Sequence, residues 1–132
     1  MERQASELHE ALMSLSEELA AAISARDADR ATRGVREDEH VVYVSDGAVI
    51  RGREYREMLR QLYARMQQID FRWERREVEP VGENAGVVIG WAAIALLDNG
   101  GVSSTNKALF TLVYRETGGS WELLSAHKTT VP

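Results

Sequence analysis

Three histidines are the side chains of this sequence best suited to acid–base chemistry near neutral pH. His9 lies beside the apolar stripe of the first predicted helix, His40 follows the charged run REDE, and His127 lies in the terminal segment SAHKTT. His127 could act as a general acid or base, but no nearby carboxylate has the spacing to orient its ring. We therefore rank a structural role above a catalytic one, with a partner from another strand left open.

The sequence gives little support for a cysteine-based, metal-binding, phosphate-binding or serine-nucleophile site. The chain has no cysteine, which excludes disulfides, thiolate catalysis and sulfur-bound metal. We read the carboxylates of REDE as a solvated run and predict neither a metal site nor a cofactor. No glycine-rich loop leads into a helix, and no Gly-x-Ser-x-Gly motif is present.

Length and charge narrow the class of protein further. A chain of 132 residues fits a single domain, here residues 1–132. The net charge of −5 argues against nucleic acid as a partner, and the charges of FRWERREVE nearly cancel. The longest apolar stretch, residues 85–97, is too short to cross a membrane, and the N-terminus lacks the apolar segment of a secretory signal. We expect a cytoplasmic location.

Hydrophobic spacing predicts the elements that must position any site. Residues 5–26 form one amphipathic helix, because its apolar residues recur every three or four positions: Leu8, Leu12, Leu15, Leu19 and Ile23. A short helix begins near Ala28, capped by Asp27, and ends near Gly34. The pattern then predicts strands at 40–45 and 48–51 and a helix at 53–68, followed by four long strands within 69–80, 85–97, 104–115 and 121–130. The buried stripe of the helix at 53–68 comprises Tyr55, Met58, Leu59, Leu62, Tyr63 and Met66.

This order predicts an α+β domain in which helices cover one face of an antiparallel sheet. The strand at 87–97 is apolar at nearly every position, whereas a strand with one wet face would alternate. Its second apolar face must therefore also be buried. We expect a second copy of the same sheet to pack against it, so that the protein forms a homodimer. The alternative is a tightly curved sheet covered by its own termini.

The element order resembles the SnoaL-like branch of the nuclear transport factor 2-like superfamily. The segments that carry the resemblance are ISARDADRA, YVSDGAVIRGREYREML and FTLVYRETGGSWELLSAHKTTVP. The last of these has the family's ending: a turn, Trp121, a short apolar run, then His127 and Thr129. The resemblance covers essentially the whole chain and implies a cone: a curved antiparallel sheet of four long strands plus a short hairpin wraps around three helices from the N-terminal half. It also implies a pocket at the open end and, in many members, a dimer.

Within this superfamily, ketosteroid isomerase uses a carboxylate base with a tyrosine and a protonated aspartate as donors. In the register set by ARDAD, the base position falls on Tyr43 and the tyrosine position on Leu19. The acidic donor position falls near Phe110 or Thr111. None of these residues has the required chemistry, since the tyrosine pKa of about 10 makes Tyr43 a poor base.

Strand alternation suggests which residues of the last hairpin share a face. It places Trp121, Leu123, Ser125 and His127 on one face and Glu122, Leu124, Ala126 and Lys128 on the other. Kinase association domains with a similar ending carry a basic residue after the histidine that faces their cavity. Lys128, with Asn106, is therefore a candidate to meet a carboxylate or carbonyl, unless it is a solvated lysine at the rim. The large aromatics Tyr63, Trp73 and Trp91 are candidates for apolar walls, or for ordinary core.

Two functions follow. The first is a dimeric protein with a pocket for a small, mostly apolar molecule, lined by Leu19, Tyr43, Tyr63, Trp73, Trp91, Asn106, Phe110 and Lys128. The alternative is an acid–base enzyme of the polyketide cyclase, isomerase or dehydratase type that uses His127, Tyr43 or an unrecognised carboxylate. An enzyme should carry a buried ionisable group that points into a water-poor cavity.

Overall fold

The computed structural model describes residues 5–36 and 42–132, and it confirms the predicted order of elements. The helices are α1 (Ala5–Ser24), α2 (Ala28–Ala31) and α3 (Gly52–Ala64). The strands are β1 (Val42–Ser45), β2 (Ala48–Arg51), β3 (Met66–Pro80), β4 (Ala85–Asp98), β5 (Ser103–Thr117) and β6 (Ser120–Val131). Residues 40 and 41, where we expected the first strand to begin, lie outside the described residues.

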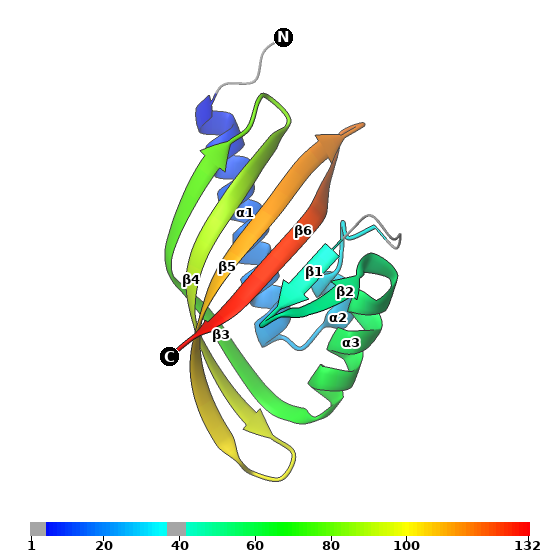
Figure 1. The fold of residues 1–132 in the computed structure, drawn as a ribbon, viewed down its shortest axis with the longest axis vertical. Coiled ribbons are helices and arrows are strands. Elements are labelled where there is room, and N and C mark those ends of the chain that lie inside the picture. The colour runs from blue at the N-terminus through cyan, green and yellow to red at the C-terminus, as the bar shows by residue number, and fades with distance from the viewer. Residues whose placement is uncertain (1–4, 37–41) are drawn as a thin grey trace.

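The sheet follows the order β2-β1-β6-β5-β4-β3. Its four long strands pair antiparallel, as the sequence predicts, and they curve around α1 (Figure 1). The hairpin of β1 and β2 joins them through a parallel pairing of β1 with β6, in which Tyr43 lies opposite Ala126. The result is the predicted α+β cone. None of the described helices is long and apolar enough to cross a membrane.

Helix α1 lies in the concave face of the sheet, mainly against β3 and β4. The predicted leucine stripe explains this placement, because Leu8, Leu12 and Leu19 are buried at its centre. Asp27 caps α2 as expected, with its Oδ1 accepting a hydrogen bond of 3.0 Å from the Arg30 amide. The chain leaves α2 through Gly34, whose φ of +87° disfavours other residues.

Helix α3 ends earlier than its apolar stripe suggests. The prediction carried it to residue 68, but it ends at Ala64, and Met66 is already the first residue of β3. The ladder explains the difference, because Met66 pairs with Asp98 and thereby extends the β3–β4 ribbon to its full length. Backbone hydrogen bonds to a neighbouring strand outweigh the helical pattern at this junction.

A bulge in β6 overturns the predicted division of its faces. Tyr114 pairs with Leu123 and Val113 pairs with Ser125, so Leu124 is an extra residue in the ladder. Leu123 therefore shares the inner face with Ala126, and both are buried. The expectation that Leu123 lies on the same face as Ser125 and His127 was wrong. Simple alternation cannot anticipate an inserted residue.

Gly90 of β4 lies opposite a bulge, where it allows close packing. The bulge is in the partner strand β3, between Trp73 and Arg75. The Trp73 ring lies directly on Gly90, since a Cβ at this position would be 2.3 Å from Cζ3 of the ring. Gly90 thus lets an indole fit between β4 and α1.

We expect Gly90→Ala to lower the free energy of unfolding by about 1–3 kcal/mol, because the added methyl group would force the Trp73 ring out of its position. Urea denaturation followed by circular dichroism measures the change. Gly100→Ala is the control, since the only close atom there is the Asp98 carboxylate of an exposed turn, at 3.3 Å. Equal stability of the Gly90→Ala variant and the unmodified protein would contradict the packing argument.

Candidate functional site

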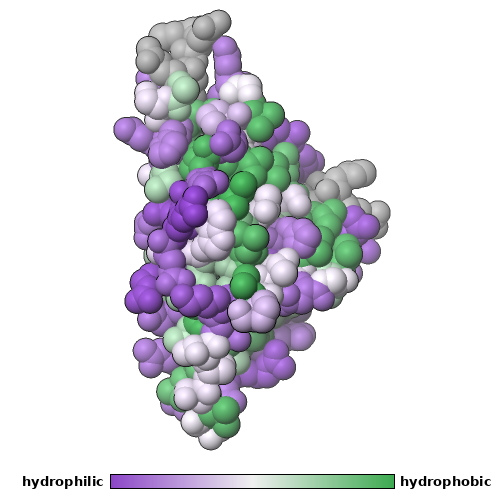
Figure 2. All heavy atoms as spheres, turned by 60° about the vertical axis from the view of Figure 1, so that its left-hand side comes forward, coloured by the Kyte–Doolittle hydropathy of each residue, from purple (hydrophilic) through white to green (hydrophobic). Residues whose placement is uncertain are grey.

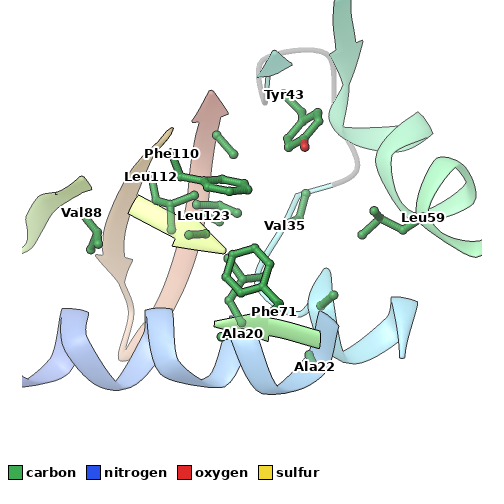
Figure 3. Close-up of a cluster of buried hydrophobic side chains, with 14 of the residues drawn as sticks. Ala20, Ala22, Val35, Tyr43, Leu59, Phe71, Val88, Phe110, Leu112 and Leu123 are labelled. Atoms are coloured by element: carbon green, nitrogen blue, oxygen red, sulfur yellow. The ribbon is translucent and has the colours of Figure 1, made fainter. Parts of the chain in front are cut away.

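A cavity of about 130 Å³ lies inside the cone, between α1, α3 and the inner face of the sheet. Apolar side chains from five elements form most of its wall: Leu19, Ile23, Leu59, Leu62, Ile69, Phe71, Ile94, Leu96, Phe110 and Leu112. Figure 3 shows how Tyr43, Leu59, Phe71 and Phe110 point toward one another from different elements. Three wider hollows, of about 430 to 540 Å³, are each rimmed by charged side chains. The interior cavity differs because Lys128 is the single charged residue in its described lining.

Three tyrosines are among the residues that line this cavity. Tyr43 comes from β1, while Tyr55 and Tyr63 lie two turns apart on α3. The rings of Tyr43 and Tyr55 meet edge to face with centroids 4.5 Å apart. Burial raises the pKa of all three, and for Tyr43 a hydrogen bond with the Ser45 side chain offsets part of the rise. At neutral pH these groups are therefore neutral hydroxyls that can donate hydrogen bonds.

Asn106 and Lys128 add an amide and an amine to the lining, from β5 and β6. The Nζ atom of Lys128 lies 3.8 Å from Oδ2 of Asp46, in the β1–β2 turn. Asp46 also accepts hydrogen bonds of 2.7 Å from both the amide and the hydroxyl of Thr130. These bonds, with Lys128 as a smaller contribution, lower the pKa of Asp46. Lys128 is thus held at the cavity wall by a carboxylate outside it.

Six of the eight predicted pocket residues line this one cavity: Leu19, Tyr43, Tyr63, Asn106, Phe110 and Lys128. The two tryptophans are not among its lining residues. Trp73 lies deeper under α1, where Nε1 donates a 2.9 Å hydrogen bond to the Ser16 carbonyl and the ring packs against Phe71 and Phe110. Trp91 projects from the outer face of the sheet, with the Arg75 guanidinium carbon 4.7 Å from the centre of its ring.

The structure does not bring the histidines to the cavity. His127 is exposed and, between the inward Ala126 and Lys128, it points to the outer face. His9 is exposed on α1, and His40 lies outside the described residues. The described cavity lining contains no histidine, aspartate or glutamate. Its polar groups can donate hydrogen bonds, but none is an ordinary general base at neutral pH.

Sequence reasoning named Tyr55, Leu59 and Leu62 only as the buried stripe of a helix, although they form one wall of the cavity. The stripe was a usable signal, because it marks the face that α3 turns inward. The sequence analysis did not single out Ile94 and Leu96, because nearly every residue of β4 is apolar and the sequence does not distinguish its inner face from its outer face. Among the described residues, no group of three acidic, histidine or cysteine side chains could hold a metal ion.

Comparison with known proteins agrees with this geometry. The model of the SnoaL-like domain family matches residues 12–131. The chain belongs to this family. No curated protein matches it. Three solved structures show the same fold at low sequence identity.

A nuclear transport factor 2-like superfamily protein from Salmonella enterica is 10% identical with a TM-score of 0.87, covering 98% of this chain and 94% of the other. A hexachlorocyclohexane dehydrochlorinase of the LinA type from Novosphingobium barchaimii is 16% identical with a TM-score of 0.79, covering 96% and 88%. A protein with a cystatin-like fold from Caulobacter vibrioides is 16% identical with a TM-score of 0.78, covering 94% and 89%.

The SnoaL-like fold explains why Leu19, Tyr43 and Phe110 converge. The resemblance led us to expect the catalytic positions of ketosteroid isomerase at Tyr43, at Leu19 and near Phe110 or Thr111, and of these residues Leu19, Tyr43 and Phe110 line the cavity. The fold thus places these three positions around one space, and the side chains present here are apolar or phenolic. Architecture and chemistry are separable in this family, since one frame accepts different linings.

We predict that the four tyrosines resist ionisation until the protein unfolds at alkaline pH. Tyr43, Tyr55, Tyr63 and Tyr114 are all buried, and burial raises the pKa of each. The associated stability is complete below about pH 10, the pKa of unfolded tyrosine, and falls as the pH rises further. Each tyrosine contributes up to about 1.4 kcal/mol per pH unit to this fall.

Tyrosinate absorbance at 295 nm, recorded beside circular dichroism, measures both events. The two curves should rise together above pH 10, whereas the chain in concentrated guanidinium should titrate near pH 10. Tyrosinate formation near pH 10 with an unchanged dichroism spectrum would show that the tyrosines are not buried as described.

Proposed function

We propose that this SnoaL-like chain binds a small, mostly apolar molecule in the interior cavity. The observation that carries the proposal is the lining itself, which joins a continuous apolar wall to a few hydrogen-bond donors. This combination is typical of small-molecule sites, where apolar surface provides affinity and a few polar groups fix orientation. The volume of about 130 Å³ suits a single six-membered ring, since a cavity of roughly 150 Å³ holds benzene.

The acid–base enzyme remains the less supported alternative. The described lining supplies no histidine or carboxylate, and His127 lies on the opposite face of the sheet. Tyr43, the other sequence candidate, is at the cavity, but burial raises its pKa away from that of a useful base. The dehydrochlorinase named above shares the fold, and a likeness of 16% identity extends no further than that.

Toluene should bind to the cavity, and Ile94→Phe should abolish or weaken this binding at least tenfold by filling the space. Ile94 is a half-buried lining residue, so the larger ring would project into the cavity. Chemical shift changes during an NMR titration measure the affinity. Val102→Phe is the control, because Val102 is 65% exposed in the turn between β4 and β5 and is not among the cavity-lining residues. Absence of toluene binding to the unmodified protein at millimolar concentration would contradict the proposed binding of a small apolar molecule.

We further propose that the protein works as a homodimer paired through the outer face of its sheet. Val87, Ile89 and Trp91 of β4 lie there beside Leu109 and Val113 of β5, and we call these five residues the outer patch. Val87 pairs with Val113, and Trp91 pairs with Leu109, so the side chains form a continuous surface. All five are only half-buried in the single chain. Figure 2 shows a stripe of hydrophobic residues bordered by hydrophilic ones on this side of the molecule.

A second copy of the same surface is the simplest cover for the outer patch, because a two-fold axis makes one patch complementary to itself. The inner positions of β4 are already covered by α1, so a partner is needed only for the outer ones. The long apolar run at residues 85–97 therefore has two structural roles. One face of β4 builds the core, and the other builds the interface.

Light scattering should give twice the 14.8 kDa mass of the chain. Ile89→Arg should give the mass of a single chain, because it places a charge at the centre of the outer patch, where burial without a partner is costly. Val102→Arg serves as the control, since Val102 is exposed in a turn outside the patch. A single-chain mass for the unmodified protein at micromolar concentration would end the dimer proposal.

A further inference from the structure

A row of four residues crosses the outer face of the sheet through the middle of the outer patch. Glu77 of β3 pairs with Ile89 of β4, and Ile89 pairs with Thr111 of β5. Thr111 in turn pairs with His127 of β6. Paired residues share one face of a sheet, so all four side chains point outward with Ile89. The row therefore has an acid at one end, an uncharged middle and a histidine at the other end.

Both ends of this row are exposed in the single chain. Neighbouring strands are about 4.8 Å apart, so Glu77 and His127 each lie within about 10 Å of Ile89, at the centre of the outer patch. A stable dimer buries roughly 800 Å² on each copy, an area that extends about 16 Å from its centre. A second copy that covers the outer patch therefore also covers both ends of the row.

The outer patch is a stripe that follows the strands. It extends over residues 87–91 of β4 and 109–113 of β5, about 13 Å along the strands, but it is only two strands wide. Sheets that pack face to face keep their strands either within about 30° of one another or near 90°. The aligned arrangement lays one stripe along the other. Crossed strands would instead place part of each stripe over the charged side chains of β3.

An aligned dimer can have its two-fold axis across the strands or along them. With the axis across the strands at this row, Glu77 meets Glu77 of the partner subunit, and His127 meets the partner's His127. With the axis along the strands, between β4 and β5, the row meets its own reverse, and each His127 lies opposite the partner's Glu77. Like charges opposed across an interface are unfavourable, whereas opposite charges favour association. The charge pattern therefore favours the axis along the strands.

We propose that two copies pair with aligned strands, so that His127 of each copy contacts Glu77 of the partner subunit in two symmetric ion pairs. This inference rests on the proposed dimer and adds its geometry and its dependence on pH. Histidine gains a positive charge as the pH falls between about 8 and 5, whereas glutamate is still ionised in that range. Assembly therefore takes up protons, and the dimer is tighter at pH 6 than at pH 8.

Glu77 is held in place for this contact. Arg75 donates a hydrogen bond to Oε1 of Glu77, and its guanidinium carbon lies 4.7 Å from the centre of the Trp91 ring in the outer patch. The Glu77 side chain is still 45% exposed, and a carboxylate has a second oxygen that can accept from another donor. The acid at this end of the row is thus fixed beside the outer patch and remains accessible.

The groups around His127 within its own chain do not change on pairing. Thr111 and Val44, its neighbours on the adjacent strands, are uncharged. The nearby acid is Asp46 in the β1–β2 turn, whose pKa is lowered chiefly by hydrogen bonds from Thr130 and least by the charge of His127. These groups act on His127 in the free and the paired chain alike. A change of association with pH therefore reports on the partner subunit.

Sedimentation equilibrium at pH 6 and pH 8 measures the dissociation constant of the dimer. For the unmodified protein it should be about threefold to tenfold lower at pH 6, as expected for two ion pairs at the rim of an interface. His127→Gln should abolish this difference, because glutamine does not titrate. His9→Gln is the matched control and should keep the difference, because His9 is exposed on α1 and not on the outer face.

A charge swap tests the contact itself. His127→Glu places two acids opposite each other and should weaken the dimer at least about tenfold at pH 6. Addition of Glu77→Lys to this variant exchanges the two charges and should restore the dissociation constant to within about threefold of the original value. Addition of Glu83→Lys is the control, because it gives the same net charge from an exposed position between β3 and β4. It should restore little.

A single-chain mass for the unmodified protein would end the dimer proposal itself. A dimer with the same dissociation constant at both pH values, or a difference that survives in His127→Gln, would overturn this inference and leave the dimer standing. Equal restoration by Glu83→Lys and Glu77→Lys would also overturn it, because net charge would then explain the effect. Should the swapped variants fail to fold, the comparison of His127→Gln with His9→Gln still decides the question.

Discussion

The close approach of α1 to the concave face of the sheet is the contact on which the rest of the molecule depends. Two glycines on the inner face of β4 permit it. A Cβ at Gly86 would lie 2.4 Å from Cδ1 of Leu12, and one at Gly90 would lie 2.3 Å from the Trp73 ring. Because β4 presents no side chain at these two points, the helix can lie deep in the curve of the sheet.

Polar contacts then fix where α1 lies along the sheet. Arg76 of β3 donates to the Met13 carbonyl and the Ser16 hydroxyl, and Trp73 donates to the Ser16 carbonyl. These bonds hold the middle of the helix against β3, in a region where every buried polar group needs a partner. Further along the helix, Leu19 and Ile23 face the cavity instead. Filled core and open cavity are thus consecutive parts of one helix face.

The cavity owes its other walls to segments distant in sequence. Helix α3 supplies Tyr55 and Tyr63, while the parallel pairing of β1 with β6 brings Tyr43 beside Ala126. Asp46 holds the turn of the small hairpin to Thr130 by two hydrogen bonds. The fold therefore sets which positions face the cavity, and the chemistry depends on the side chains that occupy them. In this chain they are mostly apolar, with phenols, one amide and one amine.

Local patterns in the sequence were sufficient for most of the fold. The leucine spacing of α1 and the Asp27 cap depend on neighbours three or four residues apart, and the chain order of the elements predicts an α+β domain. The cone itself was implied by the resemblance to the SnoaL-like family. The resemblance, together with the choice of large aromatic residues, named six residues that the structure places around one cavity. Where prediction failed, the cause was pairing between distant segments: the early end of α3 at Ala64 and the extra residue Leu124 in β6.

Only the tertiary structure decided which face each strand turns inward. It thereby decided that the side chains of His127, Trp73 and Trp91 lie outside the cavity lining. One inserted residue in a ladder reverses the direction of the side chains that follow, and no local pattern records it. Whether the Tyr63 hydroxyl has a hydrogen-bond partner also depends on the tertiary structure, and none of the described residues provides one. Sequence determined the elements through short-range periodicity, whereas the cavity is lined by residues more than a hundred positions apart, such as Leu19 and Lys128.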